Sequence, residues 1–172
     1  VAMRERYPAF VIPDDWVGLV EARAGMLDPE RSIAAALTVA RRHGAQVRTG
    51  EAVLRWRQDG DGVVVETAQG AYRAGQLVLS AGMWIGALVR ELELPLTVQR
   101  NALYWFDPRR DSALFTPERF PVFLGDLEPG LMLYGFPDTG DGVKVALHHF
   151  GPAVTPDAVD RQVSAEEIDH LR

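Results

Sequence analysis

The first half of the chain carries one helical pattern followed by several short strand patterns. Apolar residues at positions 33, 36, 37 and 40 share one face of a helix, and Asp28-Pro29 supplies an N-cap and a first-turn proline. With Gly44 as a stop signal, this pattern predicts a helix from Pro29 to His43. Further segments are predicted in chain order: strands at 46–49, 52–58, 63–67, 71–74 and 77–79, the last of them buried, and a helix at 84–91.

The second half is predicted to form an antiparallel sheet. Strand patterns cover 98–106, 121–124, 131–136 and 143–149, and turn-rich segments such as 107–110 and 138–142 separate them. Ser164, with Glu167 three residues later, forms a capping box that opens a last helix. The expected fold class is therefore α+β, with a seam near Leu94-Pro95.

Both ends read as the interior of a longer protein. No strand–glycine–helix unit precedes the proline-punctuated segment 7–13. The last helix has only about two turns before the sequence ends, and so short a helix gains little stability alone. We therefore expect the chain to be a fragment.

Composition and charge exclude several classes of function. The 172 residues have a net charge of −6 and a pI near 5.2, which argues against nucleic acid as a partner. The chain has no cysteine and therefore no disulfide, thiolate nucleophile or cysteine-based metal site. No apolar run approaches the ~20 residues that span a bilayer, and residues 1–7 lack the apolar core of a signal peptide. A cytoplasmic protein that binds neither membrane nor nucleic acid is expected.

The most informative segment for chemistry is 143–151, because the motifs of P-loops, nucleophile elbows, dinucleotide sites and zinc proteases are all absent. Residues two apart share a face of a strand, so Lys144, Ala146 and His148 point to one side. Lysine and histidine would stand ~13 Å apart along the strand, and the small Ala146 between them would leave room for a flat ligand that the two side chains bracket. In the alternative interpretation, Lys144 lies on the solvent face of an edge strand and His148 is structural.

Two other segments admit a functional and a structural interpretation. Ser80-Ala81-Gly82 follows an apolar strand and precedes a helix, which leaves backbone N–H groups exposed to a ligand. A plain strand-to-helix turn gives the same pattern. Aromatic residues at 104–106, 134 and 136 lie on strands, where they form core pairs or a pocket wall.

An ordered series of segments carries a family resemblance: Gly25-Met26-Leu27, 44–47, Val53, 65–72, 77–84, 100–106, 134–137, 144–148 and Phe150-Gly151. From about Arg6 onward the chain resembles the monomeric sarcosine oxidase and N-methyltryptophan oxidase family, within the D-amino-acid-oxidase-like FAD flavoproteins. The resemblance implies that residues 1–94 are part of an FAD-binding α/β domain, a helix plus a β-hairpin without the N-terminal Rossmann βαβ unit. Residues 95–172 would be an antiparallel-sheet substrate domain, truncated at its C-terminus.

The resemblance also implies roles for cofactor-binding residues. Val53 matches the position whose backbone meets the adenine end of FAD, and Ser80, Gly82 and Trp84 match the segment that runs beside the cofactor. Lys144 matches a catalytic lysine held near the flavin through water, where reduced flavin reacts with O2. A positive charge there favours the developing superoxide anion.

Two more residues match positions that meet the substrate. His148 matches the catalytic histidine near the substrate amine, and Tyr134 matches an aromatic residue that lines the substrate pocket. The loop from Tyr134 to Lys144 is one residue shorter than the family pattern.

The implied reaction is oxidation of the C–N bond of a secondary amino acid, either N-methyl or cyclic. Hydride equivalents pass to FAD, and O2 reoxidises the flavin to give H2O2. The family's phosphate-binding glycines, flavin-linking cysteine and site-closing basic residue have no counterpart in this sequence. We therefore expect the chain alone to bind FAD weakly or not at all and to be inactive. The alternatives are an FAD-dependent dehydrogenase of the glycine or dimethylglycine type and a non-catalytic binding domain on the same scaffold.

Overall fold

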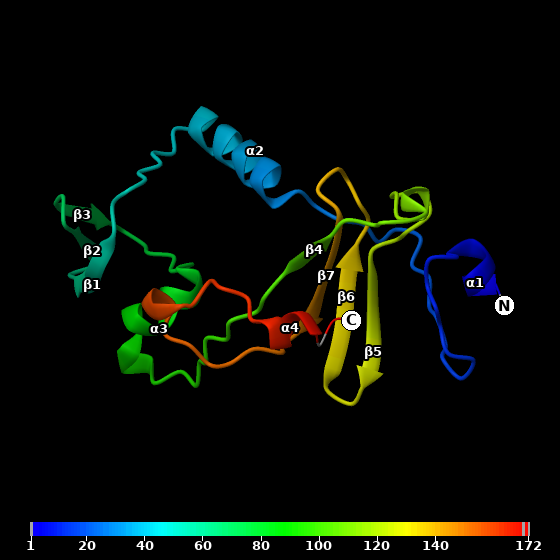
Figure 1. Cartoon of the computed structure of the whole chain (residues 1–172). Helices are drawn as coiled ribbons and strands as arrows, with labels where there is room; N and C mark the ends of the chain where they lie inside the picture. The colour runs from blue at the N-terminus through cyan, green and yellow to red at the C-terminus, as the bar shows by residue number, and fades with distance from the viewer. Residues whose placement is uncertain (1, 170, 172) are drawn as a thin grey trace. The chain divides into compact units, whose positions relative to one another are not determined.

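A computed structural model describes residues 2–169 and residue 171, and it divides the chain into two compact units (Figure 1). Unit 1 comprises Val1–Leu27 and Gln99–Arg172, and unit 2 comprises Asp28–Val98. Each unit contains one antiparallel sheet, which confirms the α+β expectation. The assignment of 1–94 and 95–172 to a cofactor and a substrate domain stays a prediction.

Unit 2 contains the predicted helix and a three-stranded sheet. Helix α2 (Pro29–Arg42) begins at Asp28, whose carboxylate accepts a hydrogen bond from the Arg31 N–H at 2.9 Å, as an N-cap should. The strands β1 (Val53–Asp59), β2 (Gly62–Thr67) and β3 (Ala71–Ala74) pair antiparallel in sequence order. Helix α3 (Ile85–Leu88) is tied to this sheet because the Trp56 indole donates a hydrogen bond of 2.7 Å to the Leu88 carbonyl.

Three predictions for unit 2 are wrong. Residues 46–49 and 77–79 form no strand, and Val78, expected to be buried, is 86% exposed. A strand needs a neighbour to pair with, and the described part of the unit offers none to either segment. The helix expected at 84–91 is divided into the 3₁₀ turn Gly82–Trp84, the short α3 and the 3₁₀ turn Arg90–Leu92.

Unit 1 is built around a four-stranded antiparallel sheet. Its strands are β4 (Tyr104–Phe106), β5 (Phe123–Glu128), β6 (Leu131–Phe136) and β7 (Val143–His148), in the spatial order β4-β7-β6-β5 (Figure 1). Short helices accompany it: α1 (Ala2–Arg6), α4 (Ala165–Asp169) and the 3₁₀ turns Ser112–Leu114 and Pro156–Ala158. No helix in the described part of the chain is long and apolar enough to cross a membrane.

The strand predictions for unit 1 are accurate for β6 and β7 and less so for the other two. The strand expected at 98–106 is reduced to β4, preceded by one isolated bridge between Gln99 and Ala153. The strand expected at 121–124 begins later and extends to Glu128, because β5 follows its hairpin partner β6 to the turn. Lys144 therefore lies on a strand with neighbours on both sides, and the edge-strand interpretation is wrong.

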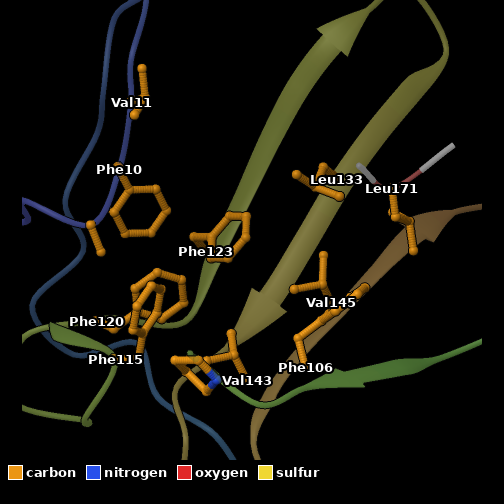
Figure 2. A pocket seen from close by; sticks show the side chains of 12 residues that line it. Phe10, Val11, Phe106, Phe115, Phe120, Phe123, Leu133, Val143, Val145 and Leu171 are labelled. Carbon is orange, nitrogen blue, oxygen red and sulfur yellow. The ribbon is translucent and has the colours of Figure 1, made fainter. Parts of the chain in front are cut away.

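One face of the sheet in unit 1, the packed face, is covered by aromatic side chains. Phe10 stacks on Phe120 with ring centroids 4.6 Å apart, and both rings meet Phe123 edge-on at 5.0 and 5.6 Å. Beside this cluster lies an apolar cavity of about 350 Å³, with Val143 and Val145 of β7 on its wall (Figure 2). The apolar side chains of β7 thus belong to the core of the unit.

The C-terminal helix is attached to the sheet through one guanidinium group. The Arg100 side chain, 12% exposed, forms an ion pair with Glu167 and donates hydrogen bonds to the carbonyls of Asp160 and Gln162 at 2.6 and 2.7 Å. The predicted capping box is present: Ser164 N–H donates to Glu167 at 2.8 Å, and Glu167 N–H donates to Ser164 Oγ at 3.2 Å. Glu167 therefore joins the helix cap to the sheet.

Replacing Glu167 by Gln is expected to make the stability of unit 1 fall less steeply as the pH is lowered. Hydrogen bonds from Arg100 and Ser164 lower the pKa of Glu167 from its ordinary 4.5. Such a carboxylate stabilises the fold above its unfolded-state pKa, and this contribution is lost as pH falls through the folded-state pKa. Thermal unfolding below pH 4.5 should show a steeper decline for the wild type than for Glu167→Gln. The exposed Glu128→Gln is the control, and an unchanged slope in Glu167→Gln would contradict the expectation.

Candidate active site

The second face of the sheet in unit 1, which we call the site face, carries the predicted chemistry. Along β7 the side chains of Lys144, Ala146 and His148 alternate with Val143, Val145 and Leu147 of the packed face, of which Val143 and Leu147 are buried. The register places Phe136, Tyr134 and Met132 of β6 opposite Lys144, Ala146 and His148, in that order. The expectation that Lys144 and His148 share a face is thus confirmed.

A row of rings runs along this face, with Lys144 between its first two members, and we call it the aromatic row. It consists of Trp105, Phe136, Tyr134 and His148. Lys144 Nζ lies 5.2 Å from the ring centroid of Trp105 and 5.0 Å from that of Phe136. Tyr134 then meets Phe136 edge-on at 6.2 Å and His148 edge-on at 5.9 Å. The row links the lysine to the histidine through side-chain contacts.

Each end of the row has a different chemical character. Within the described residues no carboxylate lies within 4.0 Å of Lys144, so its ammonium has aromatic neighbours and no ion-pair partner. Burial raises the pKa of Tyr134, which keeps its hydroxyl protonated. A cation at one end and an imidazole beside a phenol at the other suit a ligand with both anionic and polar groups.

One detail of the sequence interpretation needs correction. Ala146 is 0% exposed, and its cross-strand partner on β6 is the large Tyr134. A flat ligand would therefore rest on the rings and on Lys144, and not on a bare alanine gap. Aromatic faces offer such a ligand a larger apolar surface than a methyl group does.

The remaining predicted residues lie in unit 2. Val53 begins β1 next to a loop that Glu51 holds in place, since the Glu51 carboxylate accepts hydrogen bonds from Thr67 and Tyr72 at 2.6 and 2.7 Å. These hydrogen bonds lower the pKa of Glu51.

Ser80, Gly82 and Trp84 follow one another on the exposed segment that enters α3. Gly82 has φ of +54°, a conformation that glycine adopts without strain. The structure brings these three residues together.

Three observations indicate that the residues of the site face suit an isoalloxazine ring. The site face offers a row of rings for a planar ligand, a cation with no neutralising carboxylate for an electron-rich edge, and polar His148 and Tyr134 side chains beyond it. Sequence reasoning placed Trp105 and Phe136 on strands but missed that they flank Lys144. The strand pairing reveals it: Trp105 on β4 and Phe136 on β6 both face Lys144 across β7.

Comparison with known proteins identifies the family of the chain. The family model described as FAD dependent oxidoreductase (DAO) matches residues 2–172. A monomeric sarcosine oxidase of Streptomyces avermitilis is 39% identical over 98% of this chain and 46% of its own length. An N-methyl-L-tryptophan oxidase of Salmonella heidelberg is 36% identical over 89% of this chain and 40% of its own length. The chain thus spans less than half the length of these relatives.

Among solved structures, the open form of NikD is similar in fold. NikD is described as an unusual amino acid oxidase essential for nikkomycin biosynthesis. It matches with a TM-score of 0.58 and 24% sequence identity, covering 83% of this chain and 38% of NikD. At this identity the match supports the fold, and it adds no information on the substrate.

Proposed function

The chain belongs to the FAD dependent oxidoreductase family, and we propose that it is the central part of an FAD-dependent oxidase of secondary amino acids. The observation that carries the proposal is the aromatic row, because it joins an unneutralised lysine to a histidine–tyrosine pair on one sheet face. When bound, FAD would take two electrons from the C–N bond of the substrate and deliver them to O2, which forms H2O2 with two protons.

The residues along the aromatic row would have different roles in the reaction. Lys144 holds a positive charge beside the cofactor, where it stabilises negative charge that develops on oxygen. His148 hydrogen-bonds the substrate near its amine, and the protonated Tyr134 forms the adjoining wall of the substrate pocket. The backbone of Val53 would meet the adenine end of FAD. The segment with Ser80, Gly82 and Trp84 would run beside the cofactor.

Exposed apolar surface supports the proposal that the chain is part of a larger protein. Helix α2 has no buried residue, and its apolar side chains include Ile33 and Val39, both more than half exposed. An amphipathic helix normally covers this stripe with a partner element. We propose that the remainder of the oxidase supplies that partner and the phosphate-binding part of the FAD site.

The proposal predicts that the full-length protein is yellow because of bound flavin, and that its amino acid substrate bleaches this colour by reducing the flavin. The full-length protein that contains this chain should show a flavin absorption spectrum, and anaerobic mixing with N-methyl or cyclic amino acids should bleach it. Admission of air should restore the colour with release of H2O2. Primary amino acids of the same size are the matched control, and they should react far more slowly.

Two other results would change the conclusion. Bleaching by an amino acid, followed by slow recovery in air but fast recovery with an electron-accepting dye, would assign a dehydrogenase. A colourless protein that takes up no FAD on refolding would overturn the proposal and favour a non-catalytic binding domain.

A further inference from the structure

Lys144 is unusual in this chain both by its composition and by its surroundings. It is the only lysine among the 18 basic residues, all the others being arginine. Six of the arginines form ion pairs with carboxylates in the described structure, and Lys144 forms none. Its ammonium group therefore needs another source of orientation.

Two aromatic rings supply that orientation from both sides. Trp105 on β4 and Phe136 on β6 are the cross-strand partners of Lys144, and their ring centroids lie 5.2 and 5.0 Å from Nζ. The face of an aromatic ring attracts a cation through the ring quadrupole, most strongly for tryptophan. The lysine is thus held between two rings on neighbouring strands.

We infer that Trp105 and Phe136 are positioning residues that fix the Lys144 ammonium over the site face without neutralising it. This inference rests on the proposed oxidase function. A carboxylate partner would also orient the ammonium, but its negative charge would cancel the field felt by an approaching anion. An aromatic ring carries no net charge, so the charge of Lys144 remains available to oxygen as oxygen becomes anionic.

Removal of Trp105 and removal of Phe136 differ in how much they would disturb the surrounding structure. Trp105 is 52% exposed on a short edge strand, so its loss leaves little empty space in the core. Phe136 is half-buried and also contacts Tyr134 at 6.2 Å, so its loss would disturb the substrate end of the row as well. Trp105→Leu is therefore the informative variant, and Trp105→Phe is the conservative one that keeps a ring.

The first measurement uses this chain with isotope-labelled lysine, because one lysine gives one side-chain NMR signal. Ring currents should displace the Lys144 ε-proton signal upfield from the value for an exposed lysine. Trp105→Leu should lose about half of this displacement, and Trp105→Phe should keep most of it. Trp16→Leu, which removes an indole elsewhere in unit 1, is the control and should leave the signal unchanged. Circular dichroism confirms that each variant is folded.

The second measurement separates orientation from substrate binding in the full-length, flavin-containing protein. Trp105→Leu should reduce the rate of flavin reoxidation by O2 about tenfold, while anaerobic reduction by the amino acid stays within about twofold. Trp105→Phe should restore most of the oxygen rate. A merely structural residue would affect both half-reactions together.

The outcomes are distinguishable from failure of the proposed function. A folded wild type with an undisplaced lysine signal, or a folded Trp105→Leu with an unchanged one, overturns the positioning role. Equal reoxidation rates in Trp105→Leu and wild type also overturn it. A full-length protein without flavin overturns the oxidase function and the role in oxygen reduction, while the NMR displacement still decides whether the rings hold the lysine.

Discussion

Replacing Lys144 by Met is expected to slow the reoxidation of the reduced flavin by O2 about 10²-fold, which corresponds to about 2.7 kcal/mol. Methionine keeps an unbranched side chain between Trp105 and Phe136 but removes the positive charge. Because no carboxylate within ion-pair distance in the described structure neutralises Lys144, its full charge would contribute to stabilising an oxygen anion at the proposed site. Stopped-flow absorbance of the pre-reduced full-length protein, mixed with oxygenated buffer, measures this rate.

The same variant should reduce its flavin almost normally under anaerobic conditions. The proposed place of substrate oxidation is the end of the row formed by Tyr134 and His148, at least two strand positions from Lys144. Lys144→Arg is the matched control: it retains the charge but spreads it over a planar guanidinium, so partial activity is expected. Equal loss in both half-reactions would contradict the assignment of Lys144 to the oxygen reaction.

The sequence predicts those parts of the fold that depend on neighbouring residues. The helix after Asp28, the β1–β2–β3 strands and the β6–β7 hairpin are defined by local caps, turns and alternation, and the structure agrees with them. The segments 46–49 and 77–79 have strand-like composition but form no strand. Strand formation requires a partner, and the pairing of distant segments is not encoded in local periodicity.

The candidate site shows the same division between local and distant information. Alternation along one strand is sufficient to place Lys144 and His148 on one face, and the structure confirms it. That Trp105 flanks Lys144 depends on the pairing of β4 with β7, which brings together two residues 39 positions apart in the sequence. The burial of Ala146 likewise depends on the strands that pair with β7 on both sides, so the single-strand pattern could not predict it.

Gly151→Ala is expected to destabilise unit 1 by about 3 kcal/mol, with a fall in its melting temperature of roughly 12–24 °C. A Cβ atom at Gly151 would overlap the backbone carbonyl of Arg100 and approach Asn101 Oδ1 at 3.3 Å. The two segments are tied together by hydrogen bonds of 3.0 Å from Arg100 N–H to the Pro152 carbonyl and from Gln99 Nε2 to the Gly151 carbonyl. Neither backbone can move away without breaking them.

The effect should extend to the C-terminal helix and to the end of β7. Displacement of Arg100 removes the donor of the hydrogen bonds to Asp160 and Gln162 and the ion pair with Glu167, so the segment before α4 loses its attachment to the sheet. Hydrogen exchange should therefore accelerate first in α4 and near His148, which lies three residues before Gly151. Gly25→Ala is the control in the same unit, since nothing lies within 4 Å of its added Cβ, and it should leave stability unchanged or slightly raised. Comparable melting temperatures for the two variants would contradict the close backbone approach at Gly151.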